Sequence, residues 1–271
     1  MGFELTNYPV RFNEWGRQRK HEADRTFKAN SDAISDQERQ YATLVGVDSI
    51  LCYMVSFLCE DRTRTIERRS PTVENWRTIL AFSRYVGERT EPYPHLHGLW
   101  YVGKLTRCFC RLSNQFIAYS KQLEAIIRQH ILDLDLIAFE KLPLPDTATK
   151  APTPDSGGNV PSDPVKAFIV ARSNIVRASK DVRDCWLEGS RDLTCDELQR
   201  NFPKTYASRS KAFVDPARAV FRVGSYKQPY LLPLHRNSTV LEAVNFGFCF
   251  LQEYIVAEKV SFQSKLDHSI M

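Results

Sequence analysis

Residues 96–139 read LHGLWYVGKLTRCFCRLSNQFIAYSKQLEAIIRQHILDLDLIAF, the longest uninterrupted periodic segment of the chain. No proline falls between Pro94 and Pro143. Large apolar side chains recur at alternating intervals of three and four residues, up to His130: Val102, Leu105, Phe109, Leu112, Phe116, Tyr119, Leu123 and Ile126. This spacing is typical of a helical seam. Such a helix spans about 60 Å at 1.5 Å per residue, so we expect shorter helices to pack around it as one long central helix.

Helix starts are predicted on both sides of this segment. A Ser or Thr followed three residues later by Glu is a capping box, because each side chain binds the backbone N–H of the other residue. Three pairs have this pattern: Ser35 with Glu38, Thr194 with Glu197, and Thr239 with Glu242. Ser70 followed by Pro71 predicts a further start, because proline lacks an N–H that would be unpaired there.

The composition changes abruptly between Pro143 and Pro164, where prolines, glycines and small polar residues replace large apolar ones. Such a segment cannot bury enough surface to offset the entropy lost on ordering, so we expect a disordered Pro-rich linker. The predicted organisation is an extended N-terminal arm (1–16), a first helical part (17–141), the flexible linker (142–163), a second helical part packing on the first (164–264) and a tail (265–271).

The totals place the protein among soluble globular chains. At 271 residues and 43% hydrophobic it can bury a substantial core, and the formal charge of +5 is too small to indicate a partner. Its seven cysteines lie mostly in apolar helical patterns, which fits free thiols in a reducing compartment. The most apolar run, from Leu44 to Cys59, contains Asp48 and is shorter than the roughly 18 residues of a membrane span, so no membrane contact is expected.

No pattern for catalysis or cofactor binding stands out. There is no Gly-rich phosphate loop after a strand and no nucleophile elbow. Cys108 and Cys110 are two residues apart on a helix and face different sides, while His95 and His97 lack a second ligand pair. We therefore expect no enzyme, no cofactor and no metal site.

A basic window at 199–236 holds eight basic residues against the single acid Asp215, a formal +7, which leaves −2 for the rest of the chain. Aromatic residues are interleaved with the charges: Phe202, Tyr206, Phe213, Phe221, Tyr226 and Tyr230. This composition suits nucleic-acid phosphates with base stacking, and the candidate residues are Arg200, Lys204, Arg209, Lys211, Arg218, Arg222 and Lys227. The alternative is a solvated face whose aromatic side chains dock inward.

The helix predicted after Thr239 is apolar on two faces. Leu241, Val244, Phe248, Leu251 and Ile255 share one face. The other face carries Phe246, Phe250 and Tyr254. A helix apolar over so wide an arc must be covered from two sides. We expect the second face to be a dimer or partner interface.

Several short motifs occur in a characteristic order: Lys20-His21-Glu22-Ala23-Asp24, Tyr41-Ala42, Ser70-Pro71, Leu99-Trp100 through Arg107, and Tyr119-Ser120-Lys121. A Pro-rich insertion, a helix around Trp186 and an aromatic final helix follow. From about Arg19 onward this order resembles the C-terminal homology domain of the AFF family, the scaffolds of the super elongation complex that controls RNA polymerase II. The short linker is what we expect of a divergent member, for example a fungal one.

The resemblance implies an all-α fold of about seven or eight helices in hairpins, with packing like that of tetratricopeptide repeats. It also implies a nuclear, non-enzymatic scaffold that forms a homodimer or a heterodimer with a paralogue, with ELL- and EAF-type elongation factors as complex members and an association with DNA or RNA. The main hypothesis is therefore a dimerisation and scaffold domain of a transcription elongation complex. The alternatives are a nucleic-acid-binding module using the basic window and a helical peptide-binding adaptor.

Overall fold

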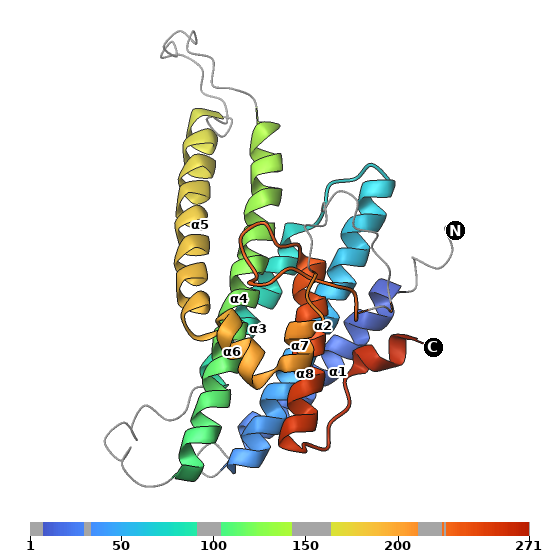
Figure 1. The fold of residues 1–271 in the computed structure, drawn as a ribbon. Helices are drawn as coiled ribbons and strands as arrows, with labels where there is room; N and C mark the ends of the chain where they lie inside the picture. The colour runs from blue at the N-terminus through green and yellow to red at the C-terminus, as the bar shows by residue number, and fades with distance from the viewer. Residues whose placement is uncertain are drawn as a thin grey trace, which may run out of the picture.

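The structure is a computed structural model that describes residues 8–29, 34–90, 104–142, 164–210, 224 and 226–270. The described residues form helices joined by turns, with no strand among them, so the all-α prediction is confirmed. The helices are α1 (Tyr8–Ala29), α2 (Asp36–Ile66), α3 (Val73–Thr90), α4 (Lys104–Glu140), α5 (Pro164–Asp192), α6 (Cys195–Asn201), α7 (Pro203–Ala207), α8 (Val240–Glu258) and a 3-10 helix (Lys265–Ile270). Figure 1 shows α4 and α5 packed side by side.

α2 is the most enclosed of the long helices. It packs against α1, α3, α8 and the 3-10 helix, and every side chain from 42 to 52 is buried. This central part of α2 is apolar on nearly all sides, with Asp48 as its charged residue, and such a helix is stable only when it is surrounded. α4 is longer and packs against α3, α5 and α8. Neither its predicted central position nor tetratricopeptide-like packing is confirmed.

The predicted seam of α4 is buried where its side chains are described. Tyr119 and Leu123 are fully buried and Ile126 is nearly so. The seam thus lies against the rest of the bundle, as its spacing predicts. Its earlier members, Val102, Leu105, Phe109, Leu112 and Phe116, lie outside the described side chains.

By length and composition, α2 and α8 could each cross a membrane. This differs from the expectation that the apolar run around Leu44 is too short. The most apolar window of α2 is, however, 89% buried within the fold. That degree of enclosure is typical of the core helix of a globular domain.

The extended N-terminal arm is wrong from Tyr8 onward, because α1 begins there. Pro9 is tolerated since it lies in the first turn, where its missing N–H has no helical acceptor. Phe12 is fully buried, and its ring lies edge-on to Trp15 at 5.2 Å and to Tyr226 at 6.3 Å. The burial of this helical face stabilises a helix where the sequence was interpreted as irregular.

A buried polar cluster joins α1, α2 and the end of the chain. The Asp48 carboxylate accepts hydrogen bonds from Arg19 Nε at 3.1 Å, from the backbone N–H of Lys265 at 3.0 Å and from the Ser264 hydroxyl. Burial raises the pKa of Asp48, although these donors favour its charged form. The expected tail at 265–271 is therefore packed as far as it is described, and Leu266 in it is fully buried.

The predicted helix starts are mostly confirmed. Both capping boxes at Ser35 and Thr239 are complete, and the Thr194 side chain accepts from the N–H of Glu197. The start at Ser70 is wrong, because α3 begins at Val73. The segment that follows Thr194 forms two short helices, α6 and α7, with Phe202 between them. The linker predicted at 142–163 lies outside the described residues from 143 onward.

Candidate partner-binding groove

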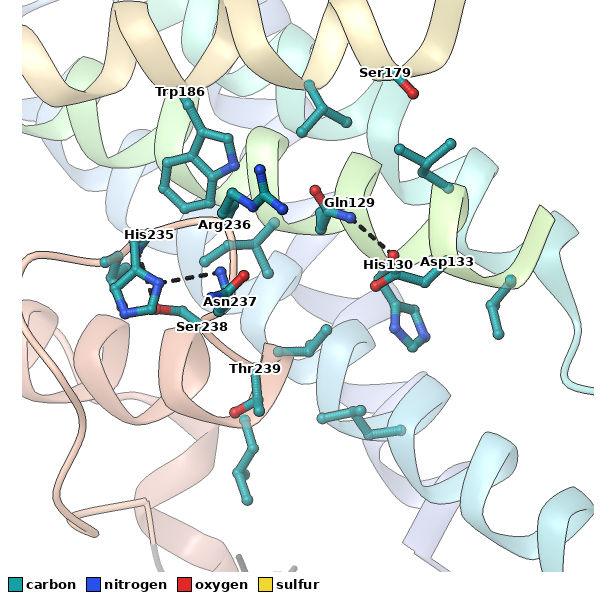
Figure 2. A pocket seen from close by; sticks show the side chains of 18 of the residues that line it. Gln129, His130, Asp133, Ser179, Trp186, His235, Arg236, Asn237, Ser238 and Thr239 are labelled. Atoms are coloured by element: carbon teal, nitrogen blue, oxygen red, sulfur yellow. Dashed lines mark hydrogen bonds between the residues drawn. The ribbon is translucent and has the colours of Figure 1, made fainter. Parts of the chain in front are cut away.

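A groove of about 1240 Å³ opens between α5, α4, the end of α2 and the segment leading into α8. Figure 2 shows its two walls. Trp186 and Ser179 project from α5, and Gln129, His130 and Asp133 lie on α4; His235, Arg236, Asn237, Ser238 and Thr239 form the opposite side. The groove thus collects residues from both halves of the chain.

The floor of the groove is apolar. Ile126, Val182 and Val240 line it and are buried to 2%, 5% and 6% exposure. Leu58 at the end of α2 and Trp186 on α5 are partly buried beside them. Val182 and Trp186 are four residues apart, so they lie on the same face of α5. A concave apolar floor of this kind suits an apolar ligand surface.

One wall carries a fixed polar group. The Asp61 carboxylate accepts a hydrogen bond from Trp76 Nε1 at 2.9 Å and lies 3.2 Å from His130 Nε2. The imidazole also stacks edge-on to the Trp76 ring at 4.5 Å. His130, which ends the predicted seam, is therefore a hydrogen-bonded structural histidine at the edge of the groove.

The rim of the groove carries charged side chains that are mainly cationic, with the exposed acid Asp133 among them. Arg62, Arg183 and Arg236 line it and are all exposed. Arg183 lies 3.4 Å from Asp184 in an exposed ion pair, which contributes little to stability. Trp186 Nε1 is buried and has no acceptor among the described residues. The groove therefore offers apolar surface and exposed positive charge to a ligand, while the buried Trp186 Nε1 lies behind that surface.

Sequence reasoning did not identify this groove. Asp61, Arg62, Arg183 and Trp186 were not singled out as a site, because nothing local connects residues so far apart along the chain. Arg236 was counted in the basic window, but only as one of its charges.

The predicted interface residues on α8 lie inside the chain. Phe246 and Phe250 are fully buried and Tyr254 is 4% exposed. Tyr119 of α4 contacts both phenylalanine rings at 5.4 Å, and the Tyr254 hydroxyl accepts a hydrogen bond from Gln40 at 2.6 Å. The assignment of these residues to a dimer or partner interface is therefore wrong: both faces of α8 are covered by the same chain.

The basic window does not present the expected stacking surface. Phe202, Tyr226 and Tyr230 are buried, so the inward-docking alternative is correct for these three rings. Arg209 stacks on Tyr206 at 3.7 Å. Among the remaining candidates, Lys204 and Lys227 are exposed, Arg200 lies 3.7 Å from Glu197, and Lys211, Arg218 and Arg222 lie outside the described residues.

No group of three or more His, Cys, Asp or Glu that could hold a metal occurs within the described ranges. His95, His97 and the side chains of Cys108 and Cys110 lie outside them. Where thiols are described they are free. Burial raises the pKa of the Cys59 thiol to about 12, which leaves it protonated and unreactive at neutral pH.

Two motifs behind the family resemblance meet in the structure. The Tyr41 hydroxyl donates a hydrogen bond to Glu22 at 2.5 Å. Ala23 and Ala42, their chain neighbours, are fully buried in one apolar cluster between α1 and α2. The motifs therefore encode the α1–α2 contact.

Comparison with known protein families finds a match for the N-terminal part of the chain. Residues 5–114, about two fifths of the chain, match the family model described as Ell binding protein Ebp1, C-terminal. No curated protein and no solved structure matches the chain. The matched segment contains α1, α2, α3 and the beginning of α4, including the motifs that meet at Tyr41. Over residues 5–114 the chain thus matches the C-terminal region of the Ell-binding protein Ebp1 family, and this match is consistent with the resemblance of its motifs to the C-terminal homology domain of the AFF family.

Proposed function

We propose that this chain is a non-enzymatic protein-binding domain that binds an ELL-type elongation factor. The observation that carries this proposal is the match of residues 5–114 to a family whose description names Ell binding. In the cell the domain would then act in the nucleus, as a scaffold of a transcription elongation complex on RNA polymerase II.

The groove supports protein binding in particular. Its apolar floor with a polar, charged rim has the composition of a protein interface, in which an apolar centre is surrounded by polar residues. The adaptor hypothesis, in which a partner helix enters a groove between helices, is thus part of the same proposal. Nucleic-acid binding has less support, because the described aromatic residues of the basic window are largely buried.

Dimerisation, as the resemblance implies, remains part of the scaffold proposal but needs another surface. The second face of α8 is unavailable because Phe246 and Phe250 lie in the core. Among the described residues, exposed large apolar side chains such as Val10 on α1 and Ile66 at the end of α2 are candidates for that surface.

The direct test is complex formation by the purified full chain with a purified ELL-type factor, followed by size-exclusion chromatography with light scattering. At about 10 µM of each protein, a complex with a Kd of about 1 µM is mostly formed. We expect the two proteins to elute together at the summed mass. Separate elution would contradict the proposed function, and the mass of the chain alone reports its oligomeric state.

A further inference from the structure

The outward face of α5 carries a second seam. Residues 169, 173, 176, 180, 183 and 187 follow one another at alternating intervals of four and three, which places them along one stripe of the helix. Ile169, Val176 and Leu187 in this seam are 58%, 64% and 58% exposed. The opposite stripe, with Val182 and Trp186, packs inward against α4 and the groove. α5 therefore carries apolar side chains on two stripes. The outer stripe also contains Ser173, Lys180 and Arg183, and its apolar side chains are not covered by described residues.

The outer seam is continuous with the groove. Arg183 and Leu187 belong to both, so an elongated ligand lying along α5 would reach the rim formed by Arg62 and Arg236. From Ile169 to Leu187 the seam covers 18 residue steps, or about 27 Å of helix. A single helix of about 18 to 20 residues matches this length.

The surface around the seam is positively charged. The part of α5 from 166 to 180 contains no acid and four cations: Lys166, Arg172, Arg177 and Lys180. All four are exposed, and none forms an ion pair with a described acid. Together with the arginines of the rim, they favour a ligand with acidic residues beside its apolar stripe.

A second copy of α5 is a poorer occupant than an acidic helix. The described acids in the second half of α5 already have cationic partners within the chain: Asp181 lies 3.1 Å from Arg128, Asp184 3.4 Å from Arg183, and Glu188 3.3 Å from Lys121. Self-pairing would therefore add cations without free acids to meet them, and like charges brought together disfavour association.

We infer that the outer seam of α5 and the adjoining groove bind one acidic amphipathic helix of a protein partner. The apolar side of that helix would cover Ile169, Val176 and Leu187, and its carboxylates would meet Lys180, Arg183 and Arg236. This inference rests on the proposed protein-binding function and assigns it a surface.

The first test uses a designed peptide, so that it does not depend on the identity of the partner. The probe is a fluorescent helix of about 20 residues with Leu at heptad positions a and d and Glu at e and g; the control peptide has Lys in place of Glu. We expect anisotropy to show binding of the acidic peptide at least about tenfold tighter than that of the basic one. Equal binding of the two peptides, or no binding of the acidic one, overturns the inference.

Variants of the full chain locate the binding surface. Val176→Asp should weaken binding of the acidic peptide at least about tenfold, because it places a carboxylate in the seam. Val256→Asp is the matched control, since Val256 on α8 is 68% exposed and lies outside the seam; it should bind as the unmodified chain does. Arg183→Glu should narrow or reverse the preference between the two peptides. Val176→Asp binding like the control would contradict the assignment.

The same variants separate this inference from the proposed function. If Val176→Asp abolishes binding of the ELL-type factor and Val256→Asp does not, the result supports both the inference and the proposed function. If both variants still bind the ELL-type factor, the proposed function is supported, but the seam is not the surface that binds the factor. A factor that fails to bind even the unmodified chain contradicts the proposed function, and the peptide experiment then still decides the seam. A dimer that Val176→Asp turns into a monomer would assign the seam to a second copy and overturn the inference.

Discussion

The hydroxyl of Tyr119 on α4 lies so close to Gly247 on α8 that a Cβ at position 247 would be 1.7 Å from its oxygen and 2.7 Å from Cζ. Tyr119 is fully buried, and its hydroxyl lies 3.3 Å from the carbonyl oxygen of Ala243. The absence of a side chain at 247 therefore allows the phenol to lie directly on the backbone of α8. This contact joins α4 to α8, the last α-helix of the chain's described part.

Gly247→Ala should destabilise the fold by about 1–3 kcal/mol, the usual range for overpacking a core. The clash must exceed the roughly 1 kcal/mol that alanine gains over glycine in a helix. Urea unfolding followed by circular dichroism measures the change. Tyr119→Phe added to Gly247→Ala should recover part of the loss, because the closest atom is removed while Cζ remains. If the Gly247→Ala chain were as stable as the unmodified one, α4 and α8 could move apart to accommodate the added methyl group at no cost in free energy.

Much of this architecture was predictable, because its signals are local. Capping pairs at Ser35 and Thr239 satisfy backbone groups within one helical turn, so they locate the starts of α2 and α8. The N-terminal half of α1 was not predicted, because burial of Phe12 against Tyr226 depends on a residue more than 200 positions away.

The candidate site was less predictable for the same reason. The pattern of α8 correctly indicated that both of its apolar faces must be buried. It carries no information on whether another copy or another part of the same chain buries them. The groove is likewise assembled from residues between Leu58 and Leu241, and no local period connects them.

Phe250→Asp distinguishes a core position from an interface position. Phe250 is fully buried and its ring lies 4.4 Å from that of Phe202. A carboxylate there would lose the apolar contacts and lack a partner, so we expect destabilisation of more than about 4 kcal/mol, at the high end for single substitutions. Thermal unfolding monitored by circular dichroism should show a much lower Tm or no cooperative transition. If the Phe250→Asp variant is a folded monomer with unchanged Tm, Phe250 is instead an interface residue.

Tyr41→Phe tests the contact between the two family motifs. The pKa of Glu22 lies below its ordinary value: burial alone would raise it, but hydrogen bonds from Tyr41 and Arg19 outweigh that effect. A carboxylate whose folded pKa is depressed contributes stability above its unfolded pKa and loses it as the pH falls through the folded value. The variant should therefore be less stable by about 0.5–1.5 kcal/mol at neutral pH.

The difference between the unmodified chain and Tyr41→Phe should shrink as the pH falls below the ordinary Glu value of 4.5, because a protonated Glu22 no longer offers a charged acceptor. Urea unfolding across a series of pH values measures this. A constant difference at every pH would mean that the tyrosine hydroxyl acts independently of the charge on Glu22.

Asp48→Ala should release the C-terminal segment from the bundle. The Asp48 carboxylate holds the Ser264 hydroxyl and the backbone N–H of Lys265, and both would be left unsatisfied at a cost of about 1–3 kcal/mol each. Leu266 is fully buried next to these donors, so its burial should be lost with them. Hydrogen exchange of residues 262–270 is the appropriate measurement, because it reports opening of this segment apart from global unfolding.

Asp267→Ala is the control for Asp48→Ala. Asp267 accepts a hydrogen bond from Gln252 at 2.8 Å outside the Asp48 cluster, and the loss of this bond should change exchange at 262–266 little. Equal acceleration by the two variants would mean that the segment is held by its general packing and not by the buried carboxylate.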